Sequence, residues 1–467
     1  MQKTQQIDNY LVTPIKEEYK KISPKYQNVF LSLKINNFDI NPLIVFRTIR
    51  SKDCFFMQKT HPGDKEPYET IMGHKISETI KITGINPIKK IRKIIRNTKS
   101  STYCDENKHN GLFSYFSYEC FQYFDKVPIL KKDPNDCPEC LVMNPEIIST
   151  YNHNEKSIVI SKKYESSIEN YDKYKDDLVK ITKSIIEKTK HLSINSPEKF
   201  KGSKSRTITK KNKYLEKIIK IKEKIISGEL IQCVLTQRFK KVSKISDQEL
   251  LEYLSINYPS EYVYQISCNE FSITGSSPEM FLKVKNNIAT IRPVAGTIGS
   301  IKGKTDSLIK KLKSSIKDKA EHIMLVDLAR NDLGKVAIPG SVKVDKLMET
   351  MSYRNVIHLV SEVNAKLRKD KDFLDAFSST FPIGTLVGAP KIRAAELINT
   401  IEEEGRGAYC GAIGWFSNDG DLETSTIIRT VIKKGEELSF NGGGGIVFDS
   451  IPEVEYQETL DKVKAFW

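Results

Sequence analysis

The periodicity of the apolar residues changes near residue 165 and again near residue 225. Before the first change, short apolar runs separated by Gly, Pro, Asn and Asp predict β-strands. Between the two changes, apolar residues recur at helical spacing among Lys and Glu. Beyond residue 227, predicted strands and helices alternate. This order predicts an α+β fold whose N-terminal third packs onto the rest.

The net charge is strongly positive. The 467 residues include 74 Lys and Arg against 59 Asp and Glu, which gives +15. The basic residues are scattered along the sequence as Lys among Ile and Asn and form no single patch, so nucleic-acid binding is the weaker interpretation. An anionic small substrate would use the same positive field. With 39% apolar residues the chain can bury a core, which excludes a wholly disordered protein.

The cysteines and the hydropathy predict a soluble, cytoplasmic protein. Eight Cys are too few for a disulfide framework. The close pair Cys137 and Cys140 has no second pair or His at zinc-ligand spacing downstream. No stretch resembles a signal peptide, and none approaches the roughly 20 apolar residues of a membrane span.

Two acidic helix faces are candidates for a metal site. Asp318 and Glu321 lie three residues apart in one predicted helix, and Glu455, Glu458 and Lys462 share one face of another. Carboxylates from two helices suit Mg²⁺, which prefers oxygen ligands and keeps waters for its substrate. Such pairs are more often solvated surface, so the spacing alone leaves both interpretations open.

Glycine is concentrated in Gly442 to Gly445, between two apolar stretches. Glycines inside a strand usually mark a place where the backbone approaches a ligand, although a bulge or a barrel corner would explain them equally well. A second glycine cluster, PVAGTIGSIKGK, lacks the spacing of a P-loop, and neither GxGxxG after a strand nor HExxH occurs. Nucleotide binding and zinc hydrolysis therefore have no support.

Ten segments between residues 205 and 463 carry a more specific signal. They are LIQCVLTQRF (230–239), ITGSSPEMF (273–281), RPVAGT (292–297), AEHIMLVDLARNDLG (320–334), PGSVKVDKLM (339–348), FPIGTLVGAPKIRAAELI (381–398), GAYCGAIGWF (407–416), IIRT (427–430), GGGIVFDS (443–450) and EYQETLDK (455–462). In this order they resemble the chorismate-utilising enzymes, and most closely the large component of anthranilate synthase. A weaker match, NGLFSYFSYE (110–119), extends the resemblance into the N-terminal third.

The resemblance implies an α+β fold of two packed antiparallel β-sheets, with helices outside and a cleft between. It also implies three parts: an N-terminal regulatory or structural domain at 25–165, a helical connector at 166–204 and a chorismate-binding catalytic domain at 205–463.

The same resemblance turns the acidic faces into an expected Mg²⁺ site. It implies that Glu321 and Glu458 bind the ion and that Asp318 and Glu455 hold its waters. Asp318 stands where the family pattern leads us to expect the longer Glu. The ring carboxylate of chorismate, bound to Mg²⁺, becomes an electron sink that eases loss of the 4-hydroxyl group.

Other roles also follow from the resemblance. Glu279 is the candidate acid that protonates the departing hydroxyl, and Thr385 belongs to the same catalytic set. His358 is expected to act in the elimination step, although a lone His in an apolar run is more often a core residue. The residues expected to bind the substrate are Gly296, Thr297, Tyr409, Arg429, Gly443, Gly444, Gly445 and Lys462.

Two positions discriminate among the family members. Members that add water carry Lys at the position of Gln232, where it can activate the water. Aminodeoxychorismate synthases carry a nucleophilic Lys where this chain has Ala295. Both positions favour anthranilate synthase, the first enzyme of tryptophan biosynthesis. The alternatives are an aminodeoxychorismate synthase and an isochorismate or salicylate synthase.

The expected reaction is attack of ammonia at ring C2 with loss of water, followed by elimination of pyruvate to give anthranilate. The sequence has no recognisable GxCxG glutaminase elbow. The resemblance therefore implies a separate glutamine amidotransferase subunit that supplies the ammonia.

Tryptophan inhibition is expected to be weak or absent. Anthranilate synthases bind tryptophan through an LLES-type motif and a Pro-Tyr-Met-like segment. The corresponding stretches here read CFFMQ (54–58) and PSEYV (259–263), in which Glu261 replaces the Pro. An added carboxylate and a lost hydroxyl should weaken binding of the tryptophan carboxylate.

Overall fold

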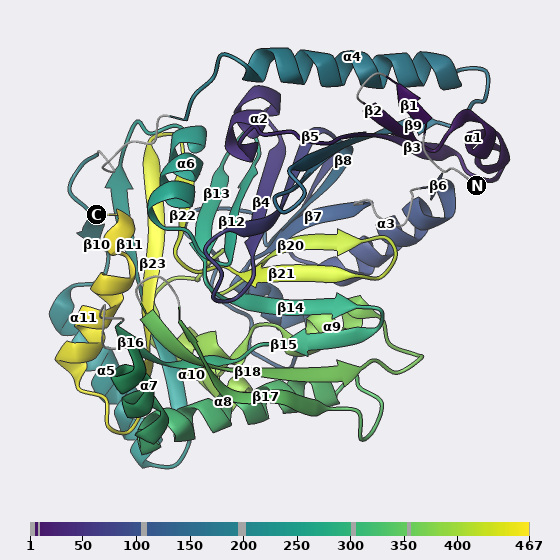
Figure 1. The fold of residues 1–467 in the computed structure, drawn as a ribbon. Helices are drawn as coiled ribbons and strands as arrows, with labels where there is room; N and C mark the ends of the chain where they lie inside the picture. The colour runs from purple at the N-terminus through teal and green to yellow at the C-terminus, as the bar shows by residue number, and fades with distance from the viewer. Residues whose placement is uncertain are drawn as a thin grey trace.

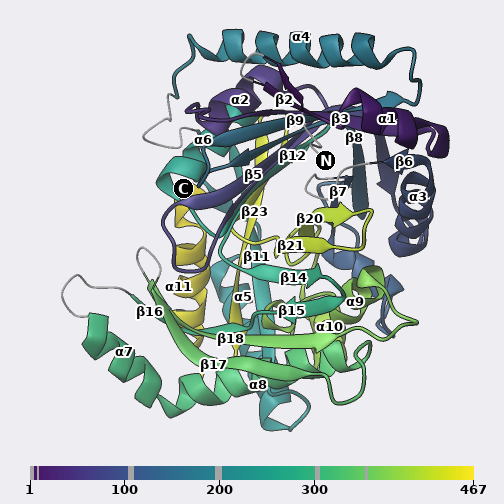
Figure 2. The same ribbon diagram turned by 45° about the vertical axis from the view of Figure 1, so that its right-hand side comes forward.

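The computed structural model describes residues 5–7, 10–103, 110–194, 202–299, 305–352 and 356–466. Its strands form a long, curved sheet, and most of its helices cover the outside (Figures 1 and 2). All of the strand pairs are antiparallel except β3–β6. The predicted α+β class with antiparallel sheets is therefore confirmed.

The N-terminal third contributes the strands at the centre of this network. They pair in the order β3–β9–β8–β5–β4, and β7 pairs with the start of β8 on the edge opposite β5. The strands are β1 (Gln5–Ile7), β2 (Tyr10–Thr13), β3 (Asn28–Ile35), β4 (Cys54–Thr60), β5 (Pro67–Ile82), β6 (Thr102–Tyr103), β7 (Gly111–Phe116), β8 (Cys140–Asn152) and β9 (Ser157–Glu165).

Two arms of strands extend from this centre. The first arm runs from β4 through β12, β13, β22 and β23 to β11. Its strands are β11 (Gln232–Val242), β12 (Tyr262–Ser267), β13 (Ser272–Ser277), β22 (Thr430–Lys434) and β23 (Glu437–Ile446), with the short β10 (Arg206–Thr207) and β19 (Gly388–Ala389) beside β11.

The second arm runs from β7 through β20, β21, β14 and β15 to β18, which also pairs with β16 and β17. The two arms are the two expected sheets, and the N-terminal strands join them into one hydrogen-bonded network. The strands of this arm are β14 (Met280–Lys285), β15 (Ile288–Ile291), β16 (Val294–Gly299), β17 (Lys343–Ser352), β18 (Val356–Lys366), β20 (Ala412–Ser417) and β21 (Leu422–Thr426).

The helices lie on the outside of the sheet. In Figure 1, α4 runs along the outer face of the N-terminal strands, α5 and α11 flank the first arm, and α8 lies along the second arm. The helices are α1 (Lys16–Ile22), α2 (Pro42–Ile49), α3 (Pro87–Ser101), α4 (Tyr171–Thr189), α5 (Lys211–Ile226), α6 (Asp247–Asn257), α7 (Thr305–Ser314), α8 (Ile316–Gly334), α9 (Phe373–Thr380), α10 (Lys391–Ile401) and α11 (Pro452–Lys462). Among the described helices, none is both long and apolar enough to cross a bilayer.

An aromatic core fills the inner side of the curved sheet. The rings of Phe55 and Phe113 stack with centroids 4.3 Å apart, and Trp415 lies 5.9 Å from Phe55. These residues come from β4, β7 and β20, so the core joins the N-terminal strands to both arms. The expectation that the N-terminal third packs onto the rest is confirmed.

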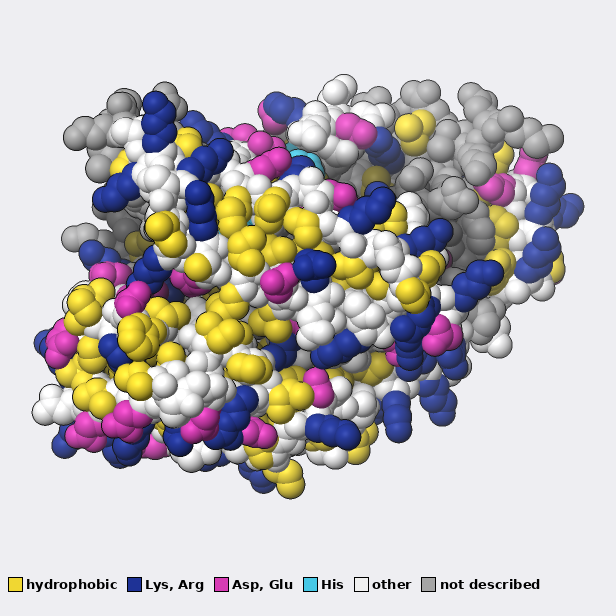
Figure 3. Space-filling view, turned by 90° about the horizontal axis from the view of Figure 1, so that it is seen from below, with side chains coloured by type: hydrophobic (Ala, Val, Ile, Leu, Met, Phe, Trp, Pro, Cys, Tyr) yellow, Lys and Arg dark blue, Asp and Glu magenta, His cyan; other side chains and the backbone are white. Residues whose placement is uncertain are grey.

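One face of the protein shows how its charged side chains are distributed. On the face seen from below, Lys and Arg side chains are interspersed with acidic and hydrophobic ones and form no continuous basic patch (Figure 3). Each of the seven described cysteines, Cys137 and Cys140 among them, is a free thiol. Both observations agree with the sequence.

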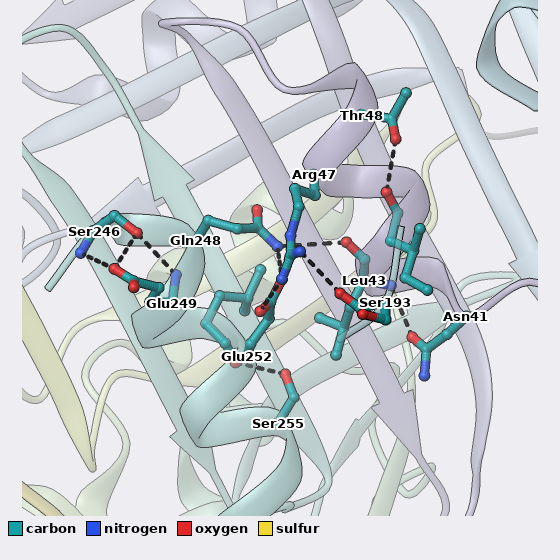
Figure 4. Close-up of polar contacts among 12 residues, drawn as sticks. Asn41, Leu43, Arg47, Thr48, Ser193, Ser246, Gln248, Glu249, Glu252 and Ser255 are labelled. Carbon is teal, nitrogen blue, oxygen red and sulfur yellow. Dashed lines mark hydrogen bonds and ion pairs between the residues drawn. The ribbon is translucent and has the colours of Figure 1, made fainter. Parts of the chain in front are cut away.

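A buried ion pair joins the N-terminal segment to the first arm. Arg47 of α2 forms a bidentate pair with Glu252 of α6, whose side chain is fully buried, and donates a third hydrogen bond to the carbonyl of Ser193 (Figure 4). Gln248 Nε2 also donates to Glu252, at 2.7 Å. The capping box between Ser246 and Glu249 fixes the start of α6.

Replacing Arg47 with Met should therefore leave a buried carboxylate without its cation. We expect the free energy of unfolding to fall by about 3 kcal/mol, measured by urea denaturation. The matched control is Lys156→Met, which breaks the exposed Lys156–Asp39 pair and should change stability by less than about 1 kcal/mol. Equal losses in the two variants would contradict this prediction.

Candidate functional site

The glycine-rich strand β23 lies next to β11 at the end of the first arm that is farthest from the N-terminal strands. It pairs with β11 in an unbroken register that places Gly443 opposite Thr236 and Gly445 opposite Val234. A bulge, the alternative explanation of the glycines, is therefore excluded. The glycines instead leave room for neighbouring side chains, because a Cβ at Gly445 would lie 2.6 Å from Gln232 Nε2.

The two crossovers between the arms carry Glu279 and Arg429. The chain passes from β13 of the first arm through Glu279 into β14 of the second, and from β21 of the second through Arg429 into β22 of the first. The crossovers lie side by side, since Ser276 N donates to Arg429 O at 3.2 Å and Thr426 N donates to Glu279 O at 3.1 Å. The fold thus brings an acid and a guanidinium together where the arms meet.

Glu279 is held in a state suited to proton donation. Its side chain is buried, and this burial, with a smaller contribution from the charge of Glu261, raises its pKa to about 7. Thr385 Oγ1 donates to Glu279 Oε1 at 2.7 Å, and this bond opposes the shift, as does Lys462. A carboxyl group with this pKa is partly protonated near neutral pH.

The Arg429 side chain is exposed, but nearby protein atoms leave its guanidinium only partly hydrated. Incomplete hydration lowers its pKa, while Tyr409 and Glu279 oppose that shift. Its φ of 50° is uncommon for a residue with a side chain, so neighbouring structure must hold it there. An exposed guanidinium whose backbone is held in place can bind a carboxylate through two parallel hydrogen bonds.

Tyr409 lies between Arg429 and the glycine strand. Burial raises its pKa well above the ordinary value, so its hydroxyl stays protonated. A Cβ at Gly443 would lie 3.0 Å from that hydroxyl. Tyr409 can therefore donate a hydrogen bond to a ligand beside the glycine backbone.

The predicted metal ligands come from α8 and α11. Gln232 Nε2 donates to Glu321 Oε1 at 3.2 Å, and this hydrogen bond links α8 to the start of β11. Burial raises the pKa of Glu321, and the negative charges of Asp318 and Glu458 add to that shift. Glu321 is therefore a half-buried, hydrogen-bonded carboxylate and not one of a solvated helix face.

Glu455 and Glu458 of α11 lie near Asp318 and Glu321 of α8, and we call these four carboxylates the acidic wall. Glu458 forms an ion pair with Lys462 at 2.6 Å, and Lys462 also donates a hydrogen bond to Gly443 O at 2.8 Å. Burial raises the pKa of Glu455, and repulsion from Glu458 adds to it, while Ser450 Oγ donates to Glu455 Oε1 at 2.6 Å.

A divalent cation fits the charge of this wall. The negative charges of Asp318 and Glu458 raise the pKa of Glu321, and that of Glu458 raises the pKa of Glu455, so a cation would relieve the repulsion among these carboxylates. As the side chains stand, no three Asp, Glu, His or Cys groups of the described residues lie close enough together to hold an ion. Cys137 and Cys140 form no such group either.

His358 and Thr297 lie in register on adjacent strands. β18 places His358 opposite Thr297 of β16 and Met351 of β17. His358 is half-buried, whereas Ile357 and Leu359 on the other face of β18 are fully buried. The core interpretation of His358 is therefore not supported. The backbones of Gly296 and Thr297 are described, and their side chains lie outside the described part of the structure.

Sequence reasoning missed the buried groups behind the site. Arg406 pairs with Glu402, and Lys391 pairs with Asp332, each deep in the protein. Glu402 and Arg406 are four residues apart, a spacing that suggests an ion pair. The sequence could not identify the partner of Arg406, however, because residues 402–404 are all glutamates.

The two segments assigned to tryptophan binding are neighbours. β4 pairs with β12 so that Gln58 lies opposite Val263. Phe55 and Met57 are fully buried in the aromatic core, and Glu261 pairs with Arg292 at 2.9 Å. Weak tryptophan inhibition stays a prediction.

Similarity to known proteins was found along nearly the whole chain. The chain is 32% identical over 480 residues to anthranilate synthase component 1 of Acetivibrio thermocellus, covering 97% of each chain. The structure matches anthranilate synthase component I from Streptococcus pneumoniae with a TM-score of 0.77 and 27% identity, covering 92% of this chain and 98% of that one.

The menaquinone-specific isochorismate synthase from Escherichia coli shares the fold, with a TM-score of 0.73 at 16% identity over 97% of both chains. The sequence model of the chorismate binding enzymes matches residues 53–467. On these similarities, the chain belongs to the chorismate binding enzyme family.

Proposed function

We propose that this chain is the synthase component of an anthranilate synthase, which converts chorismate and ammonia to anthranilate and pyruvate in the first step of tryptophan biosynthesis. The observation that carries the proposal is Gln232, whose amide contacts Glu321 in the site. An amide cannot take a proton from water near neutral pH, whereas ammonia already offers a lone pair. Ala295 likewise offers no nucleophile. Relatives named anthranilate synthase component 1 support the same activity.

Glu279 is the acid of the first step. Burial keeps part of its carboxyl group protonated near neutral pH, and this form donates a proton to the 4-hydroxyl as that group leaves ring C4 as water. Ammonia attacks ring C2, and the double bonds shift between the two positions. Thr385 holds Oε1 of Glu279, so the proton resides on the other oxygen.

The substrate is a dianion, and the cleft offers a partner for each carboxylate. Arg429 binds the enolpyruvyl carboxylate through two N–H groups, with the Tyr409 hydroxyl beside it. The backbone N–H groups of the glycine strand and of Gly296 and Thr297 hold the remaining carboxylate oxygens. The cation of Lys462 adds to the positive field at Gly443.

Glu321 and Glu458 are the residues that would hold Mg²⁺, with Asp318 and Glu455 around them. The ion would draw electron density into the ring carboxylate of the substrate. His358 of β18 then serves the elimination of pyruvate, which aromatises the ring.

The ammonia comes from a glutamine amidotransferase subunit. The relatives are named component 1, which implies a second component. An isochorismate or salicylate synthase is the alternative because the isochorismate synthase shares the fold. An aminodeoxychorismate synthase is the other alternative.

Product analysis tests this function. With chorismate, Mg²⁺ and an ammonium salt, we expect anthranilate and pyruvate in equal amounts by chromatography. Without ammonia we expect neither isochorismate nor salicylate. Either of these products would place the chain among the water-adding enzymes, and a 4-amino product would place it among the aminodeoxychorismate synthases.

The pH dependence tests the role of Glu279. Because the protonated form acts, kcat/KM should fall as the pH rises through about 7. Thr385→Val removes a hydrogen bond that favours the ionised form, so it should raise the pKa and move this limb up by roughly one pH unit. Thr385→Ser keeps the hydroxyl and is the control. If the alkaline limb of the kcat/KM profile is unchanged in Thr385→Val, the assignment of Glu279 as the acid is wrong.

Magnesium titration tests the acidic wall. Glu458→Gln removes a charged ligand, so the Mg²⁺ concentration for half-maximal activity should rise at least about tenfold. The control is Glu453→Gln, an exposed position in the first turn of the same helix. If both variants titrate like the unmodified protein, Glu458 is not a ligand.

A further inference from the structure

Arg406 is a fully buried arginine whose five N–H donors all have partners. Nε and Nη2 form a bidentate pair with Glu402, at 2.9 and 2.7 Å. Nη1 donates to Leu386 O at 2.9 Å and to Cys410 Sγ at 3.5 Å, and Nη2 donates to Val234 O at 2.7 Å. The guanidinium also lies over the ring of Tyr118, 4.8 Å from its centroid.

The acceptors of these bonds adjoin residues of the site. Leu386 directly follows Thr385, the partner of Glu279. Val234 lies two residues beyond Gln232 on β11, and Arg406 itself precedes Tyr409 by three residues. One guanidinium therefore ties together three segments that reach the substrate from different parts of the chain.

Glu402 extends this network to the glycine strand. Its Oε1 accepts hydrogen bonds from Thr236 N at 3.0 Å and from Thr236 Oγ1 at 3.1 Å. Thr236 lies opposite Gly443 in the β11–β23 ladder. The carboxylate thus fixes β11 from behind while the glycines of β23 line the site.

We propose that Arg406, held by Glu402, is a positioning residue that sets the Thr385 loop against Glu279 and the Gln232 strand. Lysine cannot replace it, because an ammonium has three donors and no planar fork to reach Glu402, Val234 and Leu386 together. A shift of the Leu386 carbonyl would move Thr385 and loosen its bond to Glu279.

The test is Arg406→Lys, measured as chorismate consumption at a temperature where the variant is folded. We expect kcat to fall at least about tenfold. The alkaline limb of kcat/KM should move up as it does in Thr385→Val. The double variant Arg406→Lys/Thr385→Val should be no slower than the slower single variant, because both changes act through one bond.

The pH readout reports on Thr385 because no hydrogen bond joins Arg406 directly to the other titratable groups near Glu279 among the described residues. They are Glu261 with its partner Arg292, Lys462, Tyr409 and Arg429. None of them is a hydrogen-bond partner of Arg406 among the described residues.

The matched control is Arg47→Lys, which makes the same change in a second bidentate Arg–Glu pair, between α2 and α6. It should lose stability and keep the kcat and the pH profile of the unmodified protein. A normal kcat and limb in Arg406→Lys, or rate losses that multiply in the double variant, would overturn the proposal. If Arg406→Lys does not fold, Glu402→Gln decides by the same criteria.

The inference rests on the proposed function only in taking Glu279 as an acid that acts on chorismate. Consumption is followed whatever product forms. A product other than anthranilate would thus reject the proposed function and leave the test of Arg406 intact.

Discussion

The antiparallel ladder between β11 and β23 is the contact on which the site depends. It brings Gln232, the glycine backbone and Thr236 into a fixed register at the end of the first arm. A side chain at Gly443 would crowd the Tyr409 hydroxyl, and one at Gly445 would clash with the Gln232 amide. The strand gives up the packing that side chains provide, and the neighbouring groups occupy the space instead. α11 packs against β23 and adds its carboxylates there.

The curvature of the sheet explains how residues so distant in sequence meet. The N-terminal strands hold the two arms apart at one end through the β4–β12 and β7–β20 ladders. At the other end the crossovers carry Glu279 and Arg429, and the Gln232–Glu321 bond links the first arm to α8. An N-terminal segment without predicted catalytic residues therefore joins the two arms that carry them.

Local patterns predicted most of the strands, the glycine strand and the two acidic helix faces, but they missed helices α2 and α3 in the N-terminal third, where only strands were expected. A carboxylate three or four residues from another marks a helix face, whatever the fold. The partners of Glu279 could not be predicted this way, because Thr385 is 106 residues away in sequence. Nor could the choice among the glutamates 402–404, of which Glu402 pairs with Arg406 and Glu403 with Lys213. Such pairings depend on tertiary contacts that no local spacing encodes.

Two buried glutamates show how the fold assigns opposite roles to one side chain. Burial favours the neutral form of both. At Glu423 the ammonium groups of Lys59 and Lys283 outweigh burial and lower the pKa to about 2, and the hydroxyls of Tyr68 and Tyr262 donate at 3.1 Å. That carboxylate stays charged and joins β21 to the N-terminal strands. Among the described residues no Lys or Arg forms an ion pair with Glu279, so burial prevails and the proton stays available. The arrangement of cations around buried carboxylates thus separates the group that holds the sheet together from the group that reacts.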